Sequence, residues 1–172
     1  SKMLDKTAIS FEIKGKQIIP KPLFMLKFMI TAAMTITLTV AALLLAPLKD
    51  NVYLFSMKNL SLHIIAPILA MIDFLMIDRG FEYKWKMTFL GFILPLLYLA
   101  MTLLISIKGV TYSNGTNFPY YFLNYREYGW FNLHGMPGVA WWILIVTVMA
   151  FAVTYLLLAF KRAVMKIQGI KD

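Results

Sequence analysis

The sequence predicts an all-α fold, a polytopic transmembrane helical bundle with four spans and both termini in the cytoplasm. Of the 172 residues, 60% are hydrophobic, and the mean hydropathy is +0.72. A soluble domain is about 45–50% apolar and needs a polar surface, which this composition cannot supply. No linker is long enough to separate two domains, so residues 1–172 are expected to form a single integral-membrane domain.

Four stretches have the length and composition of membrane helices, which need about 20 mostly apolar residues. They cover about residues 23–48, 60–77, 87–107 and 139–160. Pro67 and Pro95 fall inside the second and third stretches. Proline frees a backbone carbonyl and bends a helix, and two bent helices can open space for a cavity.

Basic residues divide unequally between the two ends of these spans. One end carries twelve of them: Lys2, Lys6, Lys14, Lys16, Lys21, Arg79, Lys84, Lys86, Lys161, Arg162, Lys166 and Lys171. The other end carries four: Lys49, Lys58, Lys108 and Arg126. By the positive-inside rule the first end is cytoplasmic. The net charge of +9 thus reflects membrane topology, and no nucleic-acid partner is expected.

Residues 108–138 form a loop on the outer side that is rich in aromatic side chains. Eight of the fourteen residues from Phe118 to Phe131 are aromatic. Tyrosine and tryptophan favour the headgroup region, where the ring is half buried and its polar tip is wet. The loop therefore either lies on the outer leaflet or caps a cavity between the helices, and the two interpretations are compatible.

Lys27 and Asp73 are charged residues inside the first and second spans. An acid near the bilayer centre costs about 2.5–3.5 kcal/mol and less toward the ends. Both residues lie a similar distance from the cytoplasmic end of antiparallel helices, so a structural ion pair is geometrically allowed. The alternatives are snorkelling of Lys27 and a hydrogen-bonded Asp73.

His63 lies near the outer end of the second span, ten residues from Asp73. That spacing corresponds to about 15 Å along the helix, so the two do not form a catalytic dyad. At the depth of His63 the third span offers Thr102. A neutral imidazole there could act as a general base toward a hydroxyl, or it could serve helix packing. Threonines 31, 35 and 39 form a stripe typical of packing.

Metal and cofactor sites are not expected. The chain has no cysteine and only one other histidine, His134 in the outer loop. No two-histidine metal spacing, phosphate-binding glycine loop or serine elbow occurs. The absence of cysteine also fits a bacterial cytoplasmic membrane protein without a structural disulfide.

Two motifs resemble those of a known family. The run "LHIIAPILAMIDFLMID", followed after one helix by "FPYYFLNYREYGW", resembles the six-helix bacterial membrane proteins related to the animal androgen-induced-gene (androgen-dependent TFPI-regulating protein) family. The matching positions are Leu62, His63, Pro67, Asp73, Pro119, Tyr120, Tyr121, Phe122, Leu123, Asn124, Gly129 and Trp130. By this resemblance the four spans correspond to helices three to six.

The resemblance implies a membrane hydrolase that splits fatty-acyl esters with a threonine nucleophile and a histidine. The histidine maps to His63, whereas the threonine lies on the family's second helix, which is expected to be absent from this chain. Asn124 stands where the family often has an acid. The residues we expect to bind a lipid or acyl substrate are Thr102, Tyr120, Tyr121, Asn124 and Trp130.

Three functions stay open at this point. The first is a lipid-directed ester hydrolase with His63 as general base in a cavity near the outer leaflet. The second is a small-solute transporter with Lys27 and Asp73 on an ion path. The third is a non-catalytic scaffold that binds partners and uses the same polar residues for packing. Membrane lipid is the expected partner in each case, and the sequence does not identify protein partners.

Overall fold

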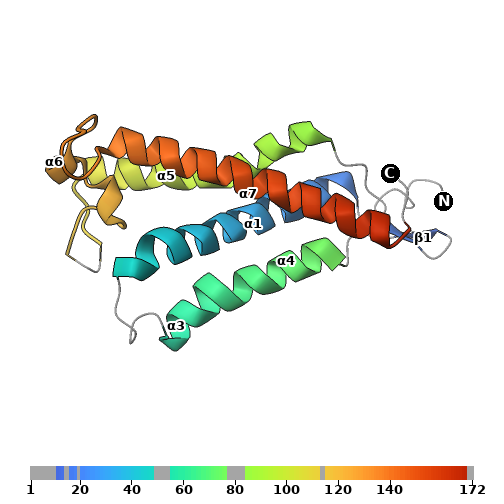
Figure 1. The fold of residues 1–172 in the computed structure, drawn as a ribbon. Helices are drawn as coiled ribbons and strands as arrows, with labels where there is room; N and C mark the ends of the chain where they lie inside the picture. Colours follow the sequence, from blue (N-terminus) through green and yellow to red (C-terminus); the bar gives the residue numbers. More distant parts are fainter. Residues whose placement is uncertain are drawn as a thin grey trace, which may run out of the picture.

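The computed structural model describes residues 11–13, 16–18, 20–48, 55–76, 84–112 and 115–169 of the chain. Its main feature is a bundle of long helices that run side by side (Figure 1). Four of them are long and apolar enough to cross a membrane: Lys21–Leu45, Met57–Met76, Trp85–Ile107 and Val139–Ile167. The fold is therefore the multi-pass helical bundle that the apolar stretches predict.

Each span except the last combines two or three types of helix. The first consists of α1 (Lys21–Val40), the π-helical turn η2 (Ala41–Leu45) and the short 3-10 helix η3 (Ala46–Leu48). The second consists of α3 (Met57–Leu60), the π-helical turn η4 (Ser61–Ile65) and α4 (Ala66–Met76). The third joins the 3-10 helix η5 (Trp85–Phe92) to α5 (Ile93–Ile107), and the fourth is α7 (Val139–Ile167).

The observed bounds differ from the predicted spans mainly in α7. It continues to Ile167, past the predicted end near residue 160, because basic residues such as Lys161 and Lys166 extend the helix beyond its apolar stretch. The second span begins three residues earlier than predicted, and its expected last residue lies outside the described part. A short antiparallel hairpin of β1 (Phe11–Ile13) and β2 (Lys16–Ile18) adds two strands that the sequence analysis did not predict.

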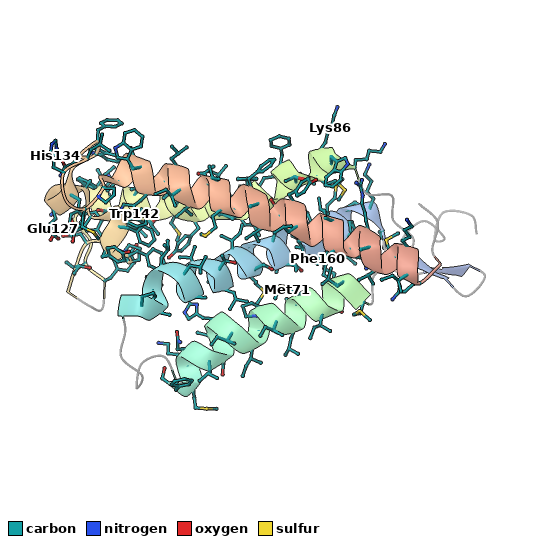
Figure 2. The ribbon with its side chains drawn as sticks, in the orientation of Figure 1. Met71, Lys86, Glu127, His134, Trp142 and Phe160 are labelled. Carbon is teal, nitrogen blue, oxygen red and sulfur yellow. The ribbon has the colours of Figure 1, made fainter. Side chains whose placement is uncertain are left out.

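The two ends of the bundle differ in what they carry. The β1–β2 hairpin, the start of α1 and the end of α7 lie at one end, and the short helix α6 (Tyr125–Tyr128) lies at the other (Figure 1). Lys86 lies at the first end, whereas Glu127 and His134 lie at the second (Figure 2). The positive-inside rule assigns the first end to the cytoplasm.

Two clusters of buried residues hold the bundle together. The inner cluster joins α1, α4, η5 and α7 near the cytoplasmic end and consists of Phe24, Phe28, Ala32, Phe74, Met87, Leu157, Leu158 and Met165. The outer cluster surrounds the aromatic loop and consists of Phe118, Phe122, Leu123 and Val139, with partly buried neighbours on α1, α5 and α7. The site described below lies between these two clusters.

Lys161 fixes the end of α4 against α7. Its side chain is fully buried, and its Nζ donates a hydrogen bond of 2.9 Å to the carbonyl oxygen of Leu75. The same Nζ lies 5.7 Å from the centroid of the Phe74 ring. The last carbonyls of a helix have no partner within the helix, so a lysine from a neighbour can satisfy one of them. Lys161 thus joins α4 to α7 at the end of the bundle that carries the β1–β2 hairpin.

Candidate functional site: an apolar cavity beside His63

A cavity of about 330 Å³ lies between α1, α5 and α7, with one wall from η4 and one from the aromatic loop. Its lining is mostly apolar, and the polar residues in it are few: Thr37, His63, Tyr98, Tyr120 and Thr147. Ligand pockets typically have volumes of about 300–1,000 Å³ and combine apolar walls with a few placed polar groups. The cavity therefore has the size and composition of a small-ligand site.

Helical periodicity explains which residues face the cavity. On α1 and η2 the lining residues are Ala33, Ile36, Thr37, Val40, Ala41 and Leu45. On α7 they are Ile143, Val146, Thr147 and Ala150. Residues three and four apart lie on one face of a helix, so each set forms a continuous stripe. The polar threonines lie within stripes that are otherwise apolar.

The aromatic loop closes the outer side of the cavity. The 3-10 helix η6 (Tyr121–Leu123) brings Phe122 and Leu123 between the helices, where each side chain is only 4% exposed. Tyr120 also lines the cavity, and its hydroxyl oxygen lies 3.4 Å from that of Tyr98 on α5. Trp142, at this end of α7 in Figure 2, packs on Phe122 with ring centroids 5.6 Å apart. Of the two interpretations of the loop, this geometry matches a cap.

The inner end of the cavity is closed by a close helix contact. Gly91 of η5 lies directly against α7, because a Cβ built on it would be 2.3 Å from Cγ2 of Thr154. The same Cβ would be 3.2 Å from Cβ of Ala32 on α1. Three helices thus meet where glycine, alanine and threonine allow a close approach, as small residues do in membrane bundles.

His63 contributes an imidazole to the cavity wall. It lies in the middle of the π-helical turn η4, and the turn η2, also π-helical, contributes Ala41 and Leu45 to the same cavity. π-helical turns are rare and frequently occur at functional sites. Among the described residues whose buried polar side-chain atoms lack a hydrogen-bond partner, His63 is the one that lines the cavity, through its Nδ1.

The ion pair between Lys27 and Asp73 is present and joins α1 to α4. Lys27 Nζ lies 2.8 Å from Asp73 Oδ2, with 25% and 46% of the two side chains exposed. Neither residue lines the cavity. Thr37 and His63 each follow ten residues outward from this pair, about 15 Å along antiparallel helices. The two residues therefore lie at the same depth in the bundle.

The structure separates the predicted substrate-binding residues. Tyr120 lines the cavity, whereas Thr102 is buried and donates its hydroxyl to the Leu99 carbonyl oxygen at 2.8 Å. Tyr121 packs edge-on against Trp142, with centroids 6.0 Å apart. Neither Thr102 nor Tyr121 lines the cavity.

The other two predicted residues stabilise the loop. Asn124 is the N-cap of α6: its side chain accepts a hydrogen bond of 3.3 Å from the backbone N–H of Glu127 and donates one of 2.8 Å to the Glu127 carboxylate. Trp130 stacks on Tyr125 with centroids 5.3 Å apart. Neither residue lines the cavity.

Sequence reasoning missed three polar residues of the cavity: Thr37, Tyr98 and Thr147. It examined the threonine stripe at 31, 35 and 39, but the hydroxyls of Thr35 and Thr39 donate to backbone carbonyls four residues earlier, each at 2.8 Å. The signal for Thr37 would have been its position on the face that also holds Ala33, Val40 and Ala41. That face becomes visible only when the neighbours of α1 are known.

Three tyrosines of the loop have raised pKa values. Burial raises the pKa of Tyr121, and burial together with the nearby Tyr98 raises that of Tyr112. Burial raises the pKa of Tyr128, and its hydrogen bond and proximity to Glu127 raise it further. All three phenols are therefore neutral at physiological pH.

The described part of the chain contains no cluster of three or more His, Cys, Asp or Glu side chains that could hold a metal ion. Comparisons of the chain with models of protein families, with curated proteins and with solved structures found no match. Function must therefore be inferred from the site itself.

Proposed function

We propose that this multi-pass membrane protein is a lipid-directed ester hydrolase in which His63 is the general base. The observation that carries the proposal is the buried Nδ1 of His63, which has no hydrogen-bond partner among the described residues and belongs to the wall of an apolar cavity. The resemblance of the two sequence motifs to the androgen-induced-gene family supports the same role. The bacterial cytoplasmic membrane is the proposed location.

The chemistry needs a hydroxyl nucleophile next to the imidazole. His63 would take the proton of the hydroxyl as its oxygen attacks the ester carbonyl, and would return that proton to the departing alkoxide. Water would then hydrolyse the acyl-enzyme by the same proton transfer. An apolar cavity favours this reaction because it strengthens the electrostatic interactions between the imidazole and the reacting groups.

Thr37 is the described hydroxyl best placed to serve as this nucleophile. It lines the same cavity as His63 and lies at the same depth, and its hydroxyl donates to the Ala33 carbonyl oxygen at 2.9 Å. A hydroxyl bonded only to a helix carbonyl can turn toward a base at little cost. By the resemblance the nucleophile is instead a threonine on the family's second helix, so the experiment must distinguish the two.

The test is labelling by a fluorophosphonate probe, which reacts with activated hydroxyl nucleophiles. We expect labelling of the wild type in lipid nanodiscs and its loss in His63→Ala. His134→Ala is the matched control, because His134 is exposed in the outer loop and lies outside the cavity lining. Loss of labelling in Thr37→Val as well would assign the nucleophile to Thr37.

Two results would contradict the proposal. Labelling that persists unchanged in His63→Ala would show that His63 activates no nucleophile. Absence of labelling in folded wild type, in the longest reading frame that contains this chain, would remove the hydrolase and favour a non-catalytic scaffold.

A further inference from the structure

We infer that the inner part of the cavity is a closed pocket that holds a short acyl group of about six carbon atoms and rejects longer ones. The inference deepens the proposed function and rests on it for the reaction, since it names the acyl group that would be transferred. The binding of the acyl chain is inferred from the shape of the cavity alone. Three features of the bundle carry it: the gap between the packed clusters, the closed inner end and the depth of His63.

The empty space lies between the two packed clusters. Val40, Leu45, Leu99, Ile143 and Val146 line the outer part of the cavity and also pack against the outer cluster. Ala33, Phe92 and Ala150 line the inner part of the cavity and belong to neither cluster. The two alanines, on α1 and α7, have small side chains that leave room for a ligand at this end.

The inner end has a rigid floor. Ala33, Phe92 and Ala150 follow directly on the contact of Ala32, Gly91 and Thr154. The Thr154 side chain is completely buried, and its hydroxyl donates to the carbonyl oxygens of Ala150 and Phe151 at 2.9 and 3.0 Å. A chain that reaches this floor cannot extend further without separating α1, η5 and α7.

The depth of His63 fixes the length of the pocket. Thr37, at the depth of His63, lies four residues outward from Ala33, which is about 6 Å along the helix. Side chains on a helix lean toward its N-terminus, and the N-terminus of the second span lies at the outer end of the bundle. The imidazole of His63 therefore lies about 2 Å further outward than its own Cα. An extended chain covers roughly 3.4 Å for every three bonds. A carbonyl at His63 thus leaves space for about six carbons above the floor.

The remainder of the lipid has a path to the membrane at the same depth. Thr37, Thr147 and Leu96 line the cavity and are exposed on its rim. Tyr98 is 44% exposed there. The alcohol part of an ester can therefore stay in the bilayer while its acyl group occupies the pocket. The bilayer is as apolar as the pocket, so moving an acyl group from one to the other gains little hydrophobic free energy. The pocket therefore selects among acyl groups by how well their length fits it.

The test is photo-crosslinking in lipid nanodiscs with saturated fatty acids of four, six and ten carbons that carry a diazirine at the terminal carbon. We expect the six-carbon probe to crosslink to the peptides that contain Ala33, Phe92 or Ala150. The ten-carbon probe should label these peptides at least about ten-fold less, the factor expected from overpacking. Crosslinking of the ten-carbon probe at the floor with equal yield would overturn the inference, as would crosslinks of the six-carbon probe confined to the aromatic cap.

Variants at the floor give a second readout. Ala150→Leu should lower the yield of the six-carbon probe about ten-fold and spare the four-carbon probe. Ala152→Leu is the matched control, because Ala152 is exposed on the same helix and lies outside the cavity lining. Should Ala150→Leu fail to fold, Phe92→Ala tests the same floor by admitting the ten-carbon probe. An unchanged length profile in a folded floor variant would overturn the inference.

A last comparison separates this inference from the proposed function. His134→Ala should keep the crosslinks and the length profile of the wild type, because His134 lies outside the cavity lining. A wild-type protein that shows both fluorophosphonate labelling and this length profile supports both proposals. A protein that shows the length profile but is never labelled has the acyl pocket and is not a hydrolase. A protein that is labelled but lacks the length profile has the activated nucleophile, and the inference about the acyl pocket is then wrong.

Discussion

Substitution of Gly91 by alanine should weaken the bundle at the floor of the cavity. The new Cβ would be 2.3 Å from Cγ2 of Thr154 and 3.2 Å from Cβ of Ala32, whereas carbon atoms pack best at about 3.5–4.0 Å. Overpacking of this kind costs about 1–3 kcal/mol, and alanine recovers up to about 1 kcal/mol of helix propensity over glycine. A contact of 2.3 Å belongs to the upper part of this range, about 2–3 kcal/mol, so we expect Gly91→Ala to lower the free energy of unfolding by about 1–2 kcal/mol.

The double variant Gly91→Ala/Thr154→Ala provides the decisive comparison. Removal of Cγ2 from Thr154 takes away the clashing atom, so the double variant should recover about 1 kcal/mol or more relative to the sum of the single variants. The assay is unfolding by SDS in mixed micelles, followed by tryptophan fluorescence. Additive effects, or a Gly91→Ala protein as stable as the wild type, would refute the close contact that we assign to the floor.

Three further predictions concern other parts of the bundle. Asp73→Asn should lower the free energy of unfolding by about 1–2 kcal/mol in the same SDS assay, because Lys27 loses the charge of a half-exposed partner. Asn124→Ala should remove the N-cap of α6 at a cost of about 1 kcal/mol, measured as faster hydrogen exchange around Glu127. Since burial raises the pKa of Tyr121, stability should be full below pH about 10 and fall as pH rises through that value toward the folded pKa. Denaturation at several pH values, compared with Tyr121→Phe, measures this dependence.

Each of these predictions has a contrary outcome. Asp73→Asn with wild-type stability would mean that the ion pair contributes nothing net. Hydrogen exchange unchanged by Asn124→Ala would show that the loop is held by its aromatic contacts alone. A decline in stability above pH 10 that persists in Tyr121→Phe would place the responsible titration elsewhere.

The bundle could be predicted from the sequence because its physical cause is local. A stretch of about 20 mostly apolar residues is too costly to expose to water, whichever segments lie beside it. Four such stretches therefore predict four spans. The ion pair of Lys27 and Asp73 could be predicted for a similar reason. Antiparallel helices of known length place residues at known depths, and an isolated charge in a membrane needs a partner.

The site was only partly predictable, because it depends on which helix faces meet. His63 stood out as a titratable group in an apolar run, and the structure places it at the cavity wall. Thr102 was chosen by depth alone, but its face of α5 turns into the protein. Asn124 and Trp130 were chosen from their motif, and both contribute to the internal order of the loop. The rotation of each helix about its own axis depends on how it packs against its neighbours. The hydrophobic periodicity of the sequence does not determine this packing.

Release of free fatty acid from short-chain esters tests the central claim most directly. The purified protein would be placed in nanodiscs that contain a six-carbon acyl ester of a membrane-anchored alcohol, and the acid would be quantified by mass spectrometry. We expect turnover by the wild type and by His134→Ala, and a loss of about 100-fold or more in His63→Ala, which is the lower end of the range for a general base. Equal release by the wild type and His63→Ala, or none by either folded protein, would contradict the claim.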